Sequence, residues 1–390
     1  MGIYNRIIGN DIKISNQLAF DFSLLFISVL LQHVHPIFVC IVFTLLLFRD
    51  IISNSFYRPF NFYNLFTILV FLQFIYCGVQ NENMTFSNAL WYSIPSILAI
   101  ILGHNFAYKT TRPDIIIAFL FIIALFLALP HIIITFIDIF SNGLINPERI
   151  LHVEGNEDAQ RAVTARTVEL SLAIGGISAI FIKKLNAPVT ITNAFIILAI
   201  AAELCTLHYV SRTGIVLILI AIASGLFLER FNLRQFVIII GLGLIIIYIF
   251  QISGLSTIFS EREINGSSIG DAGGRTERWL LGLRLLFDNP TGYHIREWYA
   301  HNFWLDFGRV GGLSAFILLS FFSVLVFIKA LKLNKYSTIG AYNRLLIVVF
   351  SIVFIATLFT EPVHSGAPLY MYFYFLFAGF IDGLYSLYKK

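Results

Sequence analysis

Charged residues are scarce in this sequence: they make up 12% of the 390 residues, whereas apolar residues make up 58%. A soluble globular protein needs more polar surface than this composition provides, so that class is excluded. Cysteine is scarce as well, and Cys40, Cys77 and Cys205 all lie in apolar stretches. An odd number of cysteines without metal-ligand spacing predicts neither a disulfide framework nor a zinc site. The composition therefore indicates a polytopic integral membrane protein.

Several other signals are missing. No internal repeat, low-complexity tract or soluble domain is evident. The segment from Met1 to Gln17 is polar, and the first apolar stretch leads directly into a second one, so no cleavable signal peptide is expected. We therefore expect residues 1–390 to form a single integral membrane domain whose first helix is an uncleaved anchor.

Apolar segments that approach the roughly 20 residues needed to span hydrocarbon recur along the chain. They predict an all-α polytopic membrane protein with about 12 transmembrane helices and two larger loops on the outer side. The expected spans are residues 18–33, 35–49, 64–80, 86–105, 115–137, 167–183, 189–207, 212–229, 235–253, 301–329, 343–360 and 367–387.

The first two spans could instead be one long tilted helix over residues 18–48. Polar groups and a proline interrupt this stretch at residues 32–36. A single helix would make Lys13 the only lysine on the outer side, whereas two helices keep the N-terminus inside with the other basic loops. The charge distribution therefore favours two helices, with both termini of the chain cytoplasmic.

Lysine is absent from the outer side of this topology. All nine lysines fall in inner segments, and the ten positive charges on the outer side are arginines 149, 161, 166, 212, 262, 275, 278, 284, 296 and 309. Lysine is a usual topological anchor, whereas the planar guanidinium of arginine binds a phosphate or carboxylate with two parallel hydrogen bonds. The pattern predicts recognition of an anion on the outer side.

Two outer loops are long enough to carry chemistry. They are expected over residues 138–166, which are rich in charge, and over residues 254–300. The tail of the second loop, from Arg278 to Phe287, has the apolar content of an amphipathic helix lying at the membrane interface. Such a helix would place Arg275 and Arg278 close to the lipid headgroups.

Two short patterns on the outer side contain candidate anion-binding residues. In Ser211-Arg212-Thr213-Gly214, Ser211 can cap the eighth span, whose positive dipole end then faces the outer headgroups. The alternative is that Arg212 is an interfacial anchor. Arg275, four residues before Trp279, is the second candidate, and its alternative is a solvated arginine or a pair with Glu277.

The third pattern is Ala300-His301-Asn302 followed by a helix with Asp306, Gly311 and Gly312. A histidine at the outer mouth of a span titrates near neutral pH and can remove a proton from a sugar hydroxyl. We expect Asn302 to orient His301, the two glycines to allow close helix packing, and Asp306 to pair with Arg309 or with an arginine of another helix. A structural histidine is the alternative.

The three patterns, together with the Leu285–Tyr293 stretch, occur in an order that resembles the O-antigen ligase and polymerase superfamily of bacterial envelope glycan assembly. The resemblance covers about residues 205–330. It implies a GT-C-like fold in the bacterial inner membrane, with the active site facing the periplasm. The ligase motif usually ends in Gly, Thr or Tyr where this chain has Ala315, and the loop between Arg275 and His301 is shorter than in ligases.

The same resemblance implies roles for single residues. Arg212 and Arg275 correspond to the pair that holds the diphosphate of an undecaprenyl-linked donor, with Arg278 nearby, and His301 corresponds to the histidine that activates the acceptor hydroxyl. Ser211, Asn302, Asp306 and Glu277 are supporting candidates. The implied glycosyl transfer is inverting and needs no metal or other cofactor, and acidic metal motifs of the DxD kind are absent from the outer loops.

We therefore expect a repeat-unit polymerase that transfers a growing glycan from undecaprenyl diphosphate to a lipid-linked repeat unit. The alternatives are an O-antigen ligase that transfers glycan to lipid A-core and, from another class, a flippase or exporter of lipid-linked sugars. A transporter typically lines a central cavity with charge near the bilayer midplane, whereas here the charge gathers at the outer mouth. The expected partners are the lipid-linked oligosaccharide, the bilayer and a chain-length regulator or flippase of the same pathway, but no nucleic acid.

Overall fold

The computed structural model describes residues 16–31, 37–53, 62–109, 129–143, 275–294, 299–336, 340–359 and 368–389, with single positions between 113 and 123 and between 193 and 217. This part of the chain is all-helical and contains no strand. Its helices are α2 (Asn16–Leu31), α3 (Ile37–Ile52), α4 (Phe62–Gln80), α5 (Phe86–Tyr108), α7 (Leu129–Asn142), α13 (Arg275–Asp288), α14 (Phe303–Leu333), α15 (Gly340–Phe359) and α17 (Pro368–Tyr388).

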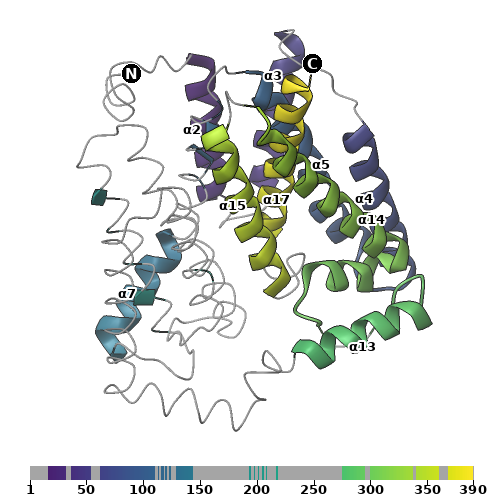
Figure 1. Cartoon of the computed structure of the whole chain (residues 1–390). Coiled ribbons are helices and arrows are strands. Elements are labelled where there is room, and N and C mark those ends of the chain that lie inside the picture. Colours follow the sequence, from purple (N-terminus) through teal and green to yellow (C-terminus); the bar gives the residue numbers. More distant parts are fainter. Residues whose placement is uncertain are drawn as a thin grey trace, which may run out of the picture.

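Most of these helices run along one bundle, and α13 lies across one end of it (Figure 1). Two of them, Phe86–Tyr108 and Phe303–Leu333, are long and apolar enough to cross a membrane. The apolar helices Leu65–Gln80, Ile132–Ser141 and Asn343–Leu358 are shorter. The structure thus agrees with a helical membrane protein.

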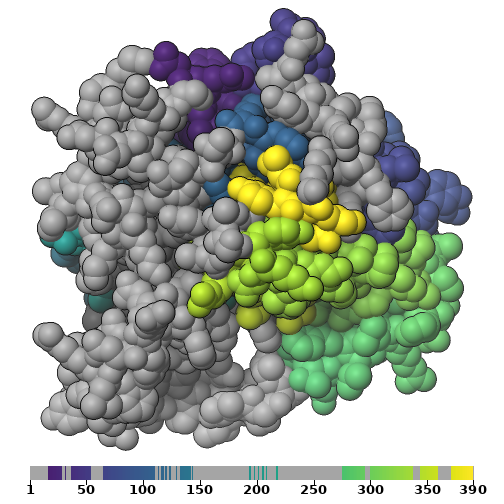
Figure 2. Space-filling view, turned by 45° about the horizontal axis from the view of Figure 1, so that its top comes forward, coloured from purple at the N-terminus to yellow at the C-terminus, as the bar shows by residue number. Residues whose placement is uncertain are grey.

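The α17 helix is the centre of the bundle. Its side chains from Tyr370 to Leu384 are all buried, and it packs against α5, α14 and α15. Figure 2 shows its C-terminal part, in yellow, between the blue segment of α5 and the green segments of α14 and α15. A Cβ atom added to Gly103 would lie 2.0 Å from the carbonyl oxygen of Leu376, so α5 and α17 approach each other as closely as small residues permit.

The predicted pair of helices near the N-terminus is confirmed, since α2 and α3 are separate helices. The two helices pack against each other, which a single continuous helix could not do. The predicted fifth span, residues 115–137, ends too early. Described positions between 113 and 123 are helical, and α7 runs from Leu129 to Asn142. The predicted spans 167–183 and 235–253 lie outside the described residues.

Buried charges tie five helices together at the end of the bundle that contains Asp382, here called the Asp382 end. Asp382 of α17 binds His104 of α5 at 2.9 Å and forms an ion pair with Lys329 of α14. Because these residues lie near the C-termini of their helices, α5, α14 and α17 run parallel to one another.

A second network at the same end joins the start of α2 to the ends of α3 and α5. Asp21 pairs with Arg49 and lies 2.9 Å from Lys109, while Asp50 pairs with the same two cations. The two carboxylates are fully buried. Charge is therefore balanced within this network, as a buried cluster requires.

Candidate functional site

The site elements lie at the opposite end of the bundle, here called the His301 end, where α14 is broken. Gly312 has φ +81° and ψ 175°, so the helix stops after nine residues and then resumes. Leu313 donates its N–H to the carbonyl of Pro290 at 2.9 Å, and Tyr293 donates to the carbonyl of Arg309 at 3.1 Å. The segment that follows α13 thereby satisfies backbone groups that the break in α14 leaves open.

Glycine is required at this break for two reasons. The φ of Gly312 lies in the left-handed region, and a Cβ atom there would be 2.6 Å from the carbonyl oxygen of Pro290. The neighbouring Gly311 lies 3.1 Å, measured from an added Cβ, from the backbone of Phe74 in α4. The expected close packing thus holds for Gly311, whereas Gly312 breaks the helix, which the sequence did not predict.

The loop between α4 and α5 joins this assembly through polar side chains that sequence analysis missed. Asn81 donates to the carbonyl of Thr291 at 2.5 Å, and Asn83 donates to the carbonyl of Arg309 at 3.4 Å. His294 hydrogen-bonds the side chain of Asn83 at 2.9 Å. The available signal was the polar run at residues 80–85 between two apolar spans on the expected outer side.

Asn302 and Asp306 together organise the start of α14. The side-chain oxygen of Asn302 accepts from the N–H groups of Trp304 and Leu305 at 3.0 and 3.2 Å, so Asn302 is the N-cap. Asn302 thus has a capping role, which its position directly before the helix explains, and its expected role in orienting His301 stays a prediction.

The carboxylate of Asp306 binds main-chain N–H groups on both sides of His301. It accepts from Ala300 at 2.8 Å and from Asn302 at 3.0 Å. The predicted pair with Arg309 is not formed; the guanidinium of Arg309 instead lies 5.0 Å from the ring centre of Tyr299. A buried carboxylate one turn into a helix is well placed to reach back to the free N–H groups at its start.

His301 itself has φ +53°, a left-handed conformation that is uncommon for residues other than glycine. Its side chain is half-buried. Since Asp306 holds the residues immediately before and after it, the carboxylate fixes the strained backbone that directs the imidazole. Strain of this kind persists only where the surroundings enforce it and is frequent at functional sites.

Replacing Asp306 by asparagine is expected to loosen this clamp. An amide offers one acceptor oxygen in place of two, so the free energy of unfolding should fall by about 1.5–3 kcal/mol, the value of a hydrogen bond to a charged group. If His301 is the reactive group, its displacement should also lower the transfer rate by about 10²-fold. Thermal unfolding and an in vitro transfer assay measure the two effects. Asp288→Asn, at an exposed position on α13, is the matched control, and equal behaviour of the two variants would refute the clamp.

The α13 helix extends the amphipathic helix expected over residues 278–287 and confirms it as a helix. Trp279, Leu283 and Leu285 pack on a small core formed by Leu286, Tyr293, Ala300 and Leu305. Leu280 and Phe287 are 63% and 66% exposed, so α13 presents apolar side chains on its outer face as well. This distribution is typical of a helix lying at an interface between water and lipid.

Arg275 is the first residue of α13 and is half-buried, whereas Glu277 and Arg278 are exposed. Arg275 lies one helical turn before Trp279, which contacts the small core that includes Ala300. The structure therefore brings Arg275 and His301 to the same end of the bundle. Arg212 and Ser211 lie outside the described residues.

The hydroxyl of Tyr293 is within electrostatic reach of both Asp306 and Arg309. Burial raises the pKa of its hydroxyl, and the nearby charge of Asp306 raises it further, while Arg309 lowers it. The phenol is thus protonated at neutral pH and is a hydrogen-bond donor.

The outer loop expected from Asp138 begins later than predicted, because α7 continues to Asn142. Asp138 is buried and forms a 2.7 Å pair with His208, which is fully buried. Cys205 also contacts α7 through the carbonyl of Ile132. This pair anchors His208 to α7. The remaining residues of that loop, 144–166, lie outside the described residues.

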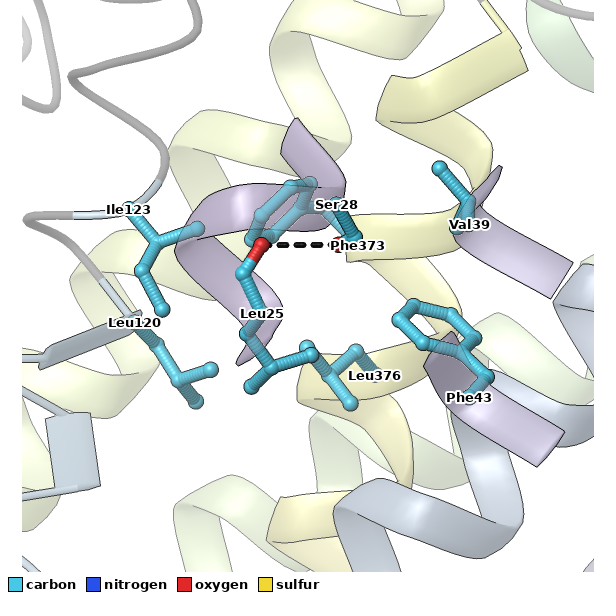
Figure 3. A pocket seen from close by; sticks show the side chains of 8 residues that line it. All are labelled: Leu25, Ser28, Val39, Phe43, Leu120, Ile123, Phe373 and Leu376. Atoms are coloured by element: carbon cyan, nitrogen blue, oxygen red, sulfur yellow. Dashed lines mark hydrogen bonds between the residues drawn. The ribbon is translucent and has the colours of Figure 1, made fainter. Parts of the chain in front are cut away.

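A small apolar cavity of about 10 Å³, the space of roughly one water molecule, lies between α2, α3 and α17 (Figure 3). Its walls include Leu25, Phe43 and Leu376. The one hydroxyl in the wall, that of Ser28, donates to the carbonyl of Leu25 at 2.7 Å. The cavity therefore offers no group that could take part in a reaction.

Comparison with known proteins adds no family to these observations. No protein-family model matches the chain, and no curated protein is significantly similar to it. Within the described residues, no group of three or more histidine, cysteine or acidic side chains is placed to hold a metal ion.

Proposed function

We propose that this chain is an O-antigen (repeat-unit) polymerase, a membrane glycosyltransferase that uses a polyprenyl-diphosphate-linked glycan donor. The observation that carries the proposal is the fixed, left-handed His301 beside a broken helix, at the end of the bundle where Arg275 and Arg278 also lie. Non-helical backbone within an apolar helix is tolerated where it is buried in protein or lines a cavity, so the break at Gly312 is compatible with a site at this end.

The proposed reaction needs a base and a cationic environment. His301 takes the proton of the acceptor hydroxyl, whose oxygen attacks the anomeric carbon of the donor sugar. The bond from that carbon to the diphosphate breaks with inversion, and the electron pair leaves with the diphosphate. Arg275 and Arg212 stabilise the charge that grows on this leaving group, which is the role of preorganised cations in transfer reactions. No metal is assigned to a step.

Exposed apolar surfaces support the membrane setting of this proposal. One face of α14 exposes Ile317, Phe321, Val324, Ile328 and Leu331, which recur at helical spacing. A surface of this kind is stable in lipid and unfavourable in water. We propose about 12 crossings in a GT-C-like arrangement in the bacterial inner membrane, with two larger periplasmic loops.

The position of the lysines supports the proposed orientation. Lys109 and Lys329 both lie at the Asp382 end, opposite to Arg275, Arg278 and Arg309. The positive-inside rule places the lysine-bearing end in the cytoplasm and the His301 end in the periplasm. The expected outcome of cysteine labelling in intact cells is that residues 150–160 and 260–275 react with an impermeant reagent, while Lys184→Cys and Lys332→Cys do not. Labelling at 332 together with protection at 265 would overturn the orientation and the site.

The lipopolysaccharide ladder of a deletion strain tests the proposed activity. A polymerase predicts loss of long chains with a single repeat unit retained on the core. Loss of every repeat unit would instead identify the ligase, and accumulation of lipid-linked repeat units on the cytoplasmic side would identify a flippase. Complementation with the wild-type gene should restore the full ladder.

A further inference from the structure

Arg309 is a buried cation that forms no ion pair with a carboxylate in the described part of the chain. The residue is 7% exposed and lies in the first segment of α14, three residues before the break at Gly312. Its Nε atom is buried and makes no hydrogen bond, and no described carboxylate lies within 4 Å of the guanidinium. Tyr299 covers one side, with its ring centre 5.0 Å from the guanidinium carbon.

The other buried cations differ from Arg309 in this respect. Lys329 pairs with Asp382, and Lys109 pairs with both Asp21 and Asp50. Asp306 lies one turn from Arg309, but its oxygens accept from the N–H groups of residues 300 and 302. Burying a cation that has no ion-pair partner among the described residues is costly, and an anion bound to Arg309 would offset part of that cost.

The backbone around Arg309 is held in place before any ligand binds. Its carbonyl accepts from the N–H of Tyr293 and from the side chain of Asn83. Gly292, with φ +104°, allows the approach, because an added Cβ would lie 2.8 Å from that carbonyl. A guanidinium on a fixed backbone loses little entropy on binding and therefore favours affinity.

We infer that Arg309 binds an oxyanion of the lipid-linked substrate at the His301 end. Guanidinium is suited to carboxylate and phosphate groups, which it binds with two parallel hydrogen bonds. The oxyanion is either the carboxylate of an acidic sugar or a phosphate of the diphosphate. Tyr299, which contacts the guanidinium, precedes His301 by two residues, and Asp306 holds the backbone on both sides of His301, so Arg309 and His301 belong to the same end of the bundle. The inference rests on the proposed function. It requires in addition that the substrate carry a negatively charged group where it meets Arg309.

Ligand-dependent unfolding of the purified full-length protein in nanodiscs tests this inference. The probes are undecaprenyl diphosphate with undecaprenol as its neutral counterpart, and methyl glucuronoside with methyl glucoside. Arg309→Met should unfold at the wild-type temperature or above, because an uncompensated buried charge has been removed. It should bind one of the two anionic probes about tenfold to a hundredfold more weakly, the fold-change for a hydrogen bond to a charged group.

Two matched variants serve as controls. Lys329→Met removes a buried cation that has a carboxylate partner, and it should lower the unfolding temperature by several degrees. Arg284→Met removes an exposed arginine of α13 and should change neither measurement. Weaker binding of undecaprenyl diphosphate identifies phosphate as the oxyanion, and weaker binding of the glucuronoside identifies an acidic sugar.

Unchanged affinity for both anionic probes would overturn the inference. A fall in unfolding temperature similar to that of Lys329→Met would also overturn it, because Arg309 would then be a structural charge. Binding is measured without glycosyl transfer, so the two proposals can fail separately. If wild type transfers no glycan but Arg309→Met still weakens anion binding, the polymerase is refuted and the anion site stands. If Arg309→Met is fully active and binds both anionic probes normally, the anion site is refuted and the polymerase stands.

Discussion

Replacement of His301 is expected to abolish glycan transfer while the protein remains folded. If the imidazole accepts the proton of the acceptor hydroxyl, His301→Ala and His301→Gln should lower the rate by about 10²- to 10⁴-fold, the usual contribution of a general base. The loss should fall on the chemical step and leave binding of the donor lipid nearly intact. In vitro transfer with purified lipid-linked repeat unit measures the rate, and thermal unfolding and lipid binding are measured on the same preparations.

The left-handed backbone of His301 provides a sharper variant than alanine. Because φ is +53°, glycine at this position removes backbone strain, and His301→Gly should be at least as stable as wild type. Asparagine also tolerates this conformation and keeps a polar side chain. A stable His301→Gly protein without transfer activity would separate the chemical role of the imidazole from any structural one.

A structural histidine would give the opposite pattern. Its loss would reduce the amount of folded protein, and glutamine or asparagine, which retain hydrogen-bonding atoms, would restore part of it. A His301→Gln protein that transfers glycan within about threefold of wild type, far below the range for a general base, would remove His301 from the catalytic residues. Glu277, which is exposed in the first turn of α13, would then be the next candidate base.

The helices of the bundle were largely predictable from hydropathy, because each apolar stretch must form its backbone hydrogen bonds within itself when it is surrounded by lipid. The predicted spans 64–80 and 86–105 correspond closely to α4 and α5, and the amphipathic stretch 278–287 corresponds to α13. Residues 115–137 were less predictable. Hydropathy alone does not specify where an apolar helix ends, and α7 continues five residues beyond the predicted span, to Asn142.

The aromatic stretch from Tyr370 to Phe375 shows a second limit of composition. By composition alone it is compatible with a lipid-facing surface or a prenyl groove, although ordinary packing is the usual role of such a stretch, and the structure buries all of it in the centre of the bundle. Which face of an apolar helix meets lipid depends on its neighbours. In α17, Gly379 and Gly383 allow the close approach of α5 and so contribute to the burial of this helix.

The sequence predicted which residues belong to the candidate site. It did not predict the hydrogen bonds that link them. The sequence identified His301, Asn302, Asp306 and the two glycines, but it did not identify the main-chain N–H groups of residues 300 and 302 as partners of Asp306. Contacts between residues 81–83 and 291–309 link segments about two hundred positions apart, and no local pattern specifies them. The break at Gly312 likewise depends on Pro290 and Tyr293, which supply its hydrogen bonds.

Arg275→Lys is expected to lose most of the transfer activity although the charge is kept, and the same is expected of Arg212→Lys. An ammonium is a point charge and cannot reproduce the two parallel hydrogen bonds that a guanidinium makes with a diphosphate. Loss of a hydrogen bond to a charged group corresponds to about a tenfold to hundredfold lower rate. The ladder of the complemented deletion strain and the in vitro rate measure this effect. Normal protein levels must be verified for each variant.

The position of Arg275 at the first residue of α13 makes the comparison with other arginines of the same helix informative. Arg284→Lys changes an exposed arginine two to three turns later and should leave the ladder intact, whereas Arg278→Lys, one turn from Arg275, tests how far the anion site extends along the helix. Arginines that only anchor the interface would tolerate lysine, since either side chain extends its charge to the headgroups. If Arg212→Lys and Arg275→Lys both restored a normal ladder at ordinary protein levels, the diphosphate role would be wrong and anchoring would be the better explanation.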